Sequence, residues 1–165
     1  MRRHYTRAEY LDTLRAAEAA VPGIGLGADV LAGFPGETEQ DQADTQALIA
    51  ESPLGYLHVF KYSPRRGSAA ERLPEKADPE TAKKGSTALR ALGAEKHRAF
   101  QERHLGKVVE VLFEDRESGW WTGFTGNYLR VGVRSDDDLA NRLGRVAVEA
   151  ARKDFVTGTL DGPLR

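Results

Sequence analysis

The 165-residue sequence contains no cysteine. This absence excludes a disulfide framework, a zinc site built from thiolates and an iron–sulfur cluster held by the chain itself. The sequence also lacks an apolar run long enough for a membrane-spanning helix, so no membrane partner is expected. MRRHYTRAEY leads into an amphipathic helix and does not read as a signal peptide, and the expected location is therefore the cytoplasm.

The sequence also has no large excess of positively or negatively charged residues. The sequence has 24 Lys and Arg residues against 25 Asp and Glu residues. This balance gives no electrostatic indication of a nucleic-acid or membrane partner. The four histidines do not have the spacing of metal ligands, and Ser63 lies in no nucleophile motif. Neither a metal site nor a catalytic residue is predicted.

The first half of the chain alternates between helical and strand patterns. Helices are predicted over Thr6–Ala20 and from Thr38 to about Glu51, and strands over Ala28–Ala32 and Tyr56–Tyr62. The first strand has no polar alternation, which is typical of a parallel strand covered on both faces. The order indicates consecutive units of a parallel α/β fold.

Two loops follow these strands, FPGET after the first and SPRRG after the second. Ligands of parallel α/β folds bind just beyond the carboxyl ends of the strands. Arg65 and Arg66 form a basic pair in the second loop, where they either face a ligand or are exposed without a function. Thr38 and Asp41 have the spacing of a helix capping box.

The second half begins with a long charged helix from Asp78 to about His104 and changes character after Gly106. Short strands separated by turn signals then predict a small closed barrel of the OB-like kind. The fold class is therefore α/β plus all-β. The predicted strands are Lys107–Glu114, Trp120–Thr125, Tyr128–Val133, Gly144–Ala151 and Phe155–Leu160.

The stretch GWWTGFTGNYLRV carries most of the barrel's aromatic residues. Adjacent Trp120 and Trp121 must face opposite sides of a strand, so one of them is expected to be exposed, with Trp121 as the first choice. An exposed aromatic beside Asn127 and Arg130 suits stacking and hydrogen bonding to unpaired bases. The alternative is an apolar core with one aromatic closing an end of the barrel.

Together these segments resemble the carboxyl-terminal half of the radical S-adenosylmethionine (SAM) methylthiotransferases that modify tRNA. MRRHYT resembles the segment after the family's fourth barrel strand, GADVLAGFPGETEQD its fifth strand, and YLHVFKYSPRRGSAAERLP its sixth. GKVVEVLFE and GWWTGFTGNYLRVGV resemble its terminal TRAM domain, a small RNA-binding β-barrel. These sequence motifs are most similar to those of the subfamily that acts on threonylcarbamoyladenosine. The family usually has an aromatic residue where Gln42 stands, and Pro where Lys61 and Arg66 stand.

The resemblance implies a partial radical SAM (TIM-like) barrel segment over residues 1–77, a connecting helix over 78–105 and a five-stranded OB-like TRAM barrel over 106–165. It implies a SAM and substrate cavity lined by Gly33, Phe34, Pro35, Gly36, Glu37, Phe60, Tyr62, Ser63 and Arg65. It further implies contacts to a tRNA anticodon loop from Trp120, Trp121, Phe124, Thr125, Asn127, Tyr128 and Arg130.

The function implied is that of a fragment of the enzyme that adds a methylthio group to threonylcarbamoyladenosine next to the anticodon. The family's cofactors are SAM and [4Fe-4S] clusters, and the cluster ligands lie in an amino-terminal half that this sequence does not include. The chain alone is therefore expected to hold no cluster and to be inactive. The alternatives are a non-catalytic RNA-binding module and one half of a split enzyme whose partner chain carries the cysteines.

Overall fold

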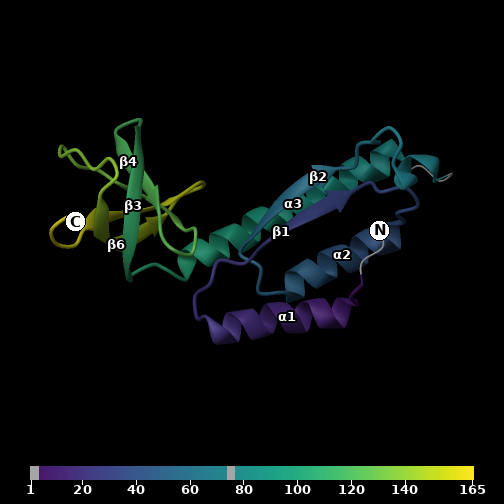
Figure 1. Cartoon of the computed structure of the whole chain (residues 1–165), viewed down its shortest axis with the longest axis horizontal. Coiled ribbons are helices and arrows are strands. Elements are labelled where there is room, and N and C mark those ends of the chain that lie inside the picture. The colour runs from purple at the N-terminus through teal and green to yellow at the C-terminus, as the bar shows by residue number, and fades with distance from the viewer. Residues whose placement is uncertain (1–3, 74–76) are drawn as a thin grey trace. The chain divides into compact units, whose positions relative to one another are not determined.

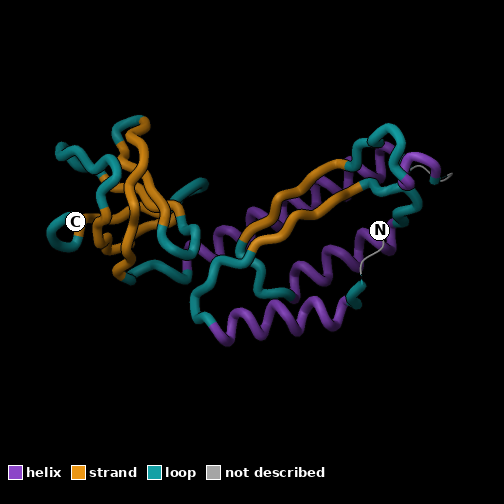
Figure 2. Tube along the Cα trace, in the orientation of Figure 1, coloured by secondary structure: helices purple, strands orange, loops and turns teal. Residues whose placement is uncertain are grey.

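The computed structural model describes residues 4–73 and 77–165. The first three residues of MRRHYT and residues 74–76 lie outside this description. The chain divides into two compact units, Met1–His97 and Arg98–Arg165. Figures 1 and 2 trace their elements along the chain. The boundary falls within helix α3 (Pro79–Glu102), and the functional assignment of the three sequence segments stays a prediction.

The first unit contains α1 (Arg7–Ala20), β1 (Gly27–Ala32), α2 (Glu39–Glu51), β2 (Tyr56–Lys61), the 3-10 helix η1 (Ala69–Arg72) and the larger part of α3. Strands β1 and β2 pair in parallel, with Gly27 opposite Tyr56 and Ala32 opposite Lys61. This arrangement confirms the α/β character predicted from the sequence.

Helices α1 and α2 both begin at capping boxes, and the sequence predicts the one at α2. The Thr38 side chain accepts a hydrogen bond from the Asp41 amide at 3.2 Å, and the Asp41 carboxylate accepts one from the Thr38 amide at 2.9 Å. Thr6 and Glu9 make the same exchange at α1. These bonds to Thr38 hold the pKa of Asp41 below its usual value, because they stabilise the charged carboxylate.

The two-stranded sheet is covered on one face. Ala32 from β1 packs in a core with Leu14 of α1, Ile49 of α2 and Leu89 of α3. The opposite face carries exposed side chains, among them Asp29, His58 and Phe60. The prediction that the first strand is covered on both faces is therefore wrong for the described residues. The apolar run could not reveal this, because the elements that cover a strand come from elsewhere in a fold.

We expect the two units to differ in local stability. Among the described strands β1 pairs only with β2, so each leaves one edge without a strand partner, whereas the second unit's strands close into a ring. Backbone amides of residues 27–61 should therefore exchange hydrogen faster than those of residues 108–160. Hydrogen exchange read by mass spectrometry on monomeric protein measures this difference. Equal protection of both regions in a monomer would contradict the prediction.

The second unit contains β3 (Val108–Glu117), β4 (Trp120–Phe124), β5 (Arg130–Val133), β6 (Leu143–Ala151) and β7 (Val156–Leu160). They form a closed barrel in the order β3-β4-β5-β7-β6, in which β5 and β7 are parallel and the other pairs are antiparallel. This topology confirms the predicted OB-like barrel. Phe100 of α3 packs against the barrel core, which includes Phe113, Val131 and Val146.

Two details of the barrel differ from the sequence-based expectation. Trp121 points inward and is only 8% exposed, so its choice as the exposed tryptophan is wrong. The strand predicted from Tyr128 begins at Arg130, because Tyr128 has a left-handed backbone with φ 63° and lies in the preceding turn. The physical reason for the first difference is register, since which of two adjacent residues points inward depends on how β4 pairs with β3 and β5.

Candidate functional site

The turn after β1 folds back on its own strand. Gly33 and Gly36 both have φ near +80°, a conformation that residues with a side chain rarely adopt. The Gly33 amide donates a 2.5 Å hydrogen bond to the Glu37 carboxylate. A Cβ atom at Gly33 would lie 2.7 Å from the Ala82 Cβ atom of α3, so glycine is required there for space as well. Glu37 therefore closes the turn.

Gln42 connects this turn to α3. Its side chain is nearly buried, and its Nε2 atom donates to the Thr81 carbonyl at 3.3 Å and contacts the Glu37 carboxylate at 3.5 Å. It also packs on Gly85, where an added Cβ atom would meet the Gln42 amide at 2.5 Å. The sequence marked Gln42 only as a departure from a family pattern, and no local signal indicated its partners.

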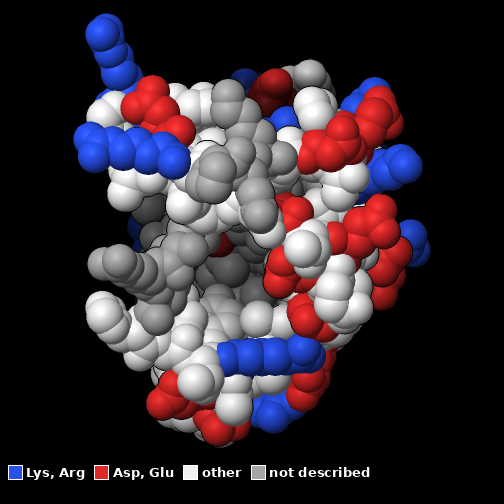
Figure 3. Space-filling view, turned by 90° about the vertical axis from the view of Figure 1, so that its right-hand side faces the viewer, with Lys and Arg blue, Asp and Glu red and all other residues white. Residues whose placement is uncertain are grey.

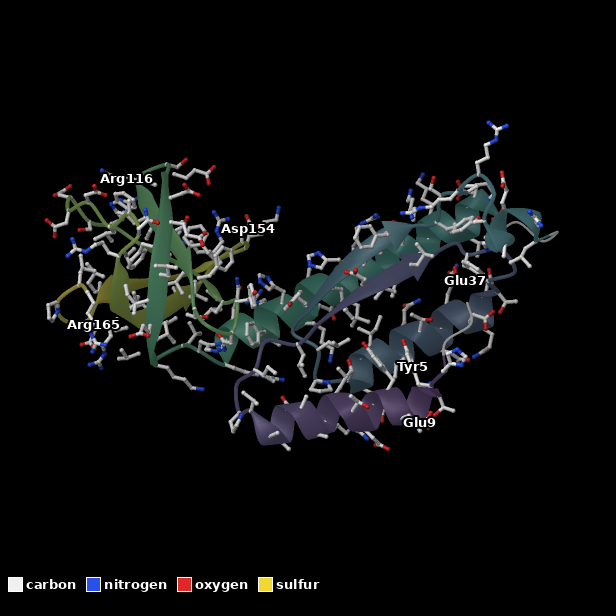
Figure 4. All side chains as sticks on the ribbon, viewed as in Figure 1. Tyr5, Glu9, Glu37, Arg116, Asp154 and Arg165 are labelled. Carbon is white, nitrogen blue, oxygen red and sulfur yellow. The ribbon has the colours of Figure 1, made fainter. Side chains whose placement is uncertain are left out.

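Three adjoining hollows lie along the sheet and at its carboxyl-terminal end. One of about 600 Å³ runs along α1, β1 and α2, and includes Tyr5, Phe34 and Glu37 in its lining. A second of about 570 Å³ shares Asp29–Leu31 with the first. A third of about 360 Å³ shares Tyr62 with the second. Figure 3 shows the molecule hollowed at this end, with acidic side chains along one side. Figure 4 labels Tyr5 and Glu37.

These hollows bring together every residue that the sequence assigned to cofactor binding. Phe34, Pro35, Gly36 and Glu37 line the first, and Gly33 lines the third with Pro35 and Tyr62. Phe60, Tyr62, Ser63 and Arg65 line the second. The placement agrees with the general position of ligands in parallel α/β folds, and the binding of SAM stays a prediction. No sequence pattern indicated a site role for Tyr5 and Tyr10, whose rings stack at 5.6 Å between centroids in the lining of the first hollow.

Among these lining residues, Tyr62 has a buried hydroxyl group. Its hydroxyl oxygen is buried and has no hydrogen-bond partner among the described residues. Its ring meets Phe34 edge-on at 5.4 Å between centroids, which fixes the hydroxyl in place. The protein encloses this hydroxyl, and Tyr62 as a residue lines the second and third hollows.

An iron–sulfur cluster does not fit the residues of this chain. The sequence has no cysteine and therefore no thiolate ligand. The described residues also contain no group of three His, Asp or Glu side chains placed to hold a metal ion. Within the described part of the chain, no helix is long and apolar enough to cross a membrane.

The outer face of β4 and β5 carries part of the predicted RNA-binding set. Trp120 and Phe124 point outward on β4, and Phe124 pairs in register with Arg130 of β5. The Arg130 guanidinium lies 3.4 Å from the Thr122 hydroxyl and 3.8 Å from the Glu117 carboxylate. The structure thus gathers Trp120, Phe124 and Arg130 on one face and leaves Trp121 inside the barrel.

The turn between β4 and β5 displays Tyr128. The Thr125 hydroxyl accepts from the Leu129 amide at 3.0 Å and donates to the Asn127 side chain at 2.5 Å. The Asn127 amide nitrogen lies 3.1 Å from Nε2 of His104, whose Nδ1 lies 2.8 Å from the Phe100 carbonyl. A carbonyl only accepts, so Nδ1 carries the proton. Thr125 and Asn127 therefore shape the turn, and Tyr128 is 73% exposed.

The chain combines an α/β unit with an OB-like barrel, and its sequence is similar to those of tRNA methylthiotransferases. The chain is 31% identical to the threonylcarbamoyladenosine tRNA methylthiotransferase MtaB of Bacillus subtilis over 163 residues, which is 96% of this chain and 36% of the relative. It is 37% identical to the tRNA-2-methylthio-N(6)-dimethylallyladenosine synthase of Sorangium cellulosum over 180 residues, covering 100% of this chain and 35% of the relative.

A second MtaB, from Rickettsia prowazekii, is 35% identical over 136 residues, or 80% of this chain and 32% of the relative. No family model matches the chain. The chain thus spans about a third of the length of these relatives, and it matches the two kinds of enzyme comparably well. Homology to the tRNA methylthiotransferases is clear, and identity alone does not assign the chain to one of the two kinds.

Proposed function

We propose that this chain is a carboxyl-terminal segment of a radical SAM tRNA methylthiotransferase. The observation that carries the proposal is similarity along 96% of the chain to an enzyme of that name, combined with the OB-like barrel at the position expected for a TRAM domain. The substrate proposed is the threonylcarbamoyladenosine nucleotide beside the anticodon. The first unit contributes to the SAM and substrate cavity, and the second binds the tRNA.

In the first unit the proposed SAM contacts come from the FPGET turn and the SPRRG loop. SAM, bound to a cluster held outside this sequence, would supply the radical chemistry of the transfer. The residues of this chain orient and enclose the reactants, and Tyr62 is among the residues that line the hollows. The exposed face of β1 and β2 lines the interior of the complete barrel in this proposal. The cluster is then held by cysteines that this sequence does not contain, in a separate chain or a further segment.

In the second unit the proposed partner is the anticodon loop of a tRNA. Trp120, Phe124, Tyr128 and Arg130 provide stacking and polar contacts from the outer face and its adjoining turn. Thr125 and Asn127 hold the turn, and Trp121 contributes from the core by supporting the strand. The charges of the whole chain nearly cancel, so affinity depends on these contacts more than on long-range attraction.

Binding to an anticodon stem-loop tests the RNA-binding part of this function. We expect the protein to prefer the stem-loop over a duplex of the same length, with moderate salt dependence. Tyr128→Ala should weaken binding about five- to hundredfold, because each stacked base contributes roughly 1–3 kcal/mol. Fluorescence anisotropy measures both effects, and Arg145→Ala, which removes an arginine paired with Asp161, is the control. Equal binding to duplex and stem-loop would contradict the proposal.

A non-catalytic RNA-binding module is the second candidate function. The specific observation in its favour is the absence of cysteine, since the barrel needs no cluster in order to bind RNA. Both candidates predict RNA binding. They differ in whether the first unit completes an active enzyme when the cysteine-bearing part is supplied.

A further inference from the structure

One side of the barrel holds an aromatic and basic group that we call the Trp120 cluster, made of Trp120, Gly132, Arg134, Arg152 and Phe155. The ring of Phe155 meets Trp120 edge-on at 5.7 Å between centroids. The guanidinium carbons of Arg134 and Arg152 lie 4.8 and 5.2 Å from the centroid of the Trp120 ring. Two cations therefore lie close to a single indole, each in cation–π contact.

Gly132 allows this arrangement. A Cβ atom at Gly132 would lie 2.6 Å from the Phe155 ring and 3.5 Å from the Trp120 ring. Strand β5 lies between β4 and β7, so the missing side chain lets Trp120 of β4 meet Phe155, which directly precedes β7, across it. Gly132 therefore positions the two rings against each other.

In the described part of the chain, the two arginines of the cluster have no acidic partner, unlike Arg130 and Arg145 of the same barrel. Arg145 pairs with Asp161 at 3.0 Å, and Arg130 lies 3.8 Å from Glu117. Among the described residues, by contrast, neither the Arg134 nor the Arg152 guanidinium has an ion pair or a side-chain hydrogen bond. Both keep their N–H donors free, and two neighbouring guanidinium charges repel unless an anion lies between them.

The Trp120 cluster lies on the part of the barrel that binds oligonucleotides in OB-like barrels. Trp120 follows the turn between β3 and β4, and Arg152 and Phe155 belong to the turn between β6 and β7, where the Arg152 amide donates to the Phe155 carbonyl at 2.9 Å. Figure 4 labels Asp154 in the latter turn. In OB-like barrels the face of the second and third strands and these two loops bind oligonucleotides. Strands β4 and β5 are the second and third strands of this barrel.

We propose that the Trp120 cluster binds one unpaired nucleotide of RNA, with its base stacked on the indole or on the guanidinium planes and its phosphate hydrogen-bonded by Arg134 and Arg152. Proteins use both aromatic rings and arginine planes to stack unpaired bases. Two free guanidinium groups supply the planar donors that match a phosphate. This inference rests on the proposed RNA-binding function and extends it to Arg134 and Arg152, with Gly132 and Phe155 positioning the Trp120 ring.

Tryptophan fluorescence tests the stacking directly. The sequence has two tryptophans, and Trp121 is only 8% exposed. A single-stranded RNA with the length of an anticodon loop should quench the emission of the wild-type protein and leave that of Trp120→Phe nearly unchanged. Trp120→Ala should weaken binding about five- to hundredfold in anisotropy, whereas Trp120→Phe keeps a ring and retains most of the affinity.

The phosphate contacts have a separate test in the salt dependence. A double variant, Arg134→Gln with Arg152→Gln, should reduce the slope of log K against log salt by about 1.4, from two contacts at roughly 0.7 each. Arg145→Gln removes a paired charge from β6 and should leave quenching and affinity unchanged. An abasic oligonucleotide of the same length should bind more weakly and cause no quenching.

The outcomes separate this inference from the proposed function. If the wild-type protein binds no RNA, both fail. If it binds RNA without quenching, and both the Trp120→Ala and the double arginine variants bind as the wild type does, RNA binding stands and this site is overturned. If circular dichroism shows that Trp120→Ala does not fold, the RNA affinities of Gly132→Ala and the double arginine variant decide whether the Trp120 cluster is the binding site. Gly132→Ala pushes the Phe155 ring aside and should weaken binding while it keeps every aromatic and basic side chain of the cluster.

Discussion

Replacing Gly123 with alanine is expected to unfold the barrel, or to lower its free energy of unfolding by at least about 3 kcal/mol. Gly123 lies in the middle of β4 and faces β3. A Cβ atom there would lie 2.0 Å from the Leu112 carbonyl oxygen and 2.7 Å from the Phe113 Cα atom. Both are backbone atoms of a paired strand, so neither can move aside without breaking the pairing of β3 with β4.

Gly126→Ala provides the matched control. Gly126 lies in the turn that follows the same strand, and an added Cβ atom would meet nothing within 4 Å. This variant should unfold within about 1 kcal/mol of the wild type, because alanine at an unstrained position changes mainly the entropy of the unfolded chain. Urea unfolding followed by the emission of buried Trp121 measures both variants. If the two have the same stability, the close packing of β3 against β4 is wrong.

Much of this fold is encoded locally and could be predicted. The Thr38 and Asp41 pair predicted the start of α2, and turn signals between short strands predicted the OB-like barrel. The wrong predictions concern features that depend on how the strands pair. The pairing of β3 with β4 has a register shift between Phe113 and Asp115. The register of this pairing decides which of the two neighbouring tryptophans points inward.

The same distinction between local and long-range features applies to the two candidate sites. The FPGET and SPRRG loops could be predicted to meet, because the carboxyl ends of parallel strands share one end of a sheet. Buried polar partners could not be predicted in this way. His104 reaches Asn127 and Gln42 reaches Thr81 across long stretches of sequence. Arg134, Arg152 and Phe155 likewise gather at Trp120 only because the barrel closes and Gly132 leaves space between its flanking strands.

The isolated chain is expected to bind no iron–sulfur cluster and to cleave no SAM. Both depend on cysteine thiolates, and the sequence has none, so the expected effect is complete loss. Purified protein should be reconstituted with iron and sulfide, and bound iron and released 5′-deoxyadenosine should be measured. Stoichiometric cluster or turnover by the chain alone would contradict this expectation.

The same assay separates the two candidate functions when a cysteine-bearing part is added. The portion of Bacillus subtilis MtaB that this chain does not match is a suitable source. If the first unit completes a methylthiotransferase, the mixture should release more 5′-deoxyadenosine than the added portion alone, and Tyr62→Ala, which removes a ring that lines the hollows, should reduce that gain while leaving iron content unchanged. A gain is expected because, among the described strands, β1 and β2 each leave one edge whose backbone groups can pair with strands of the added portion. No gain, with RNA binding intact, would instead support a non-catalytic module.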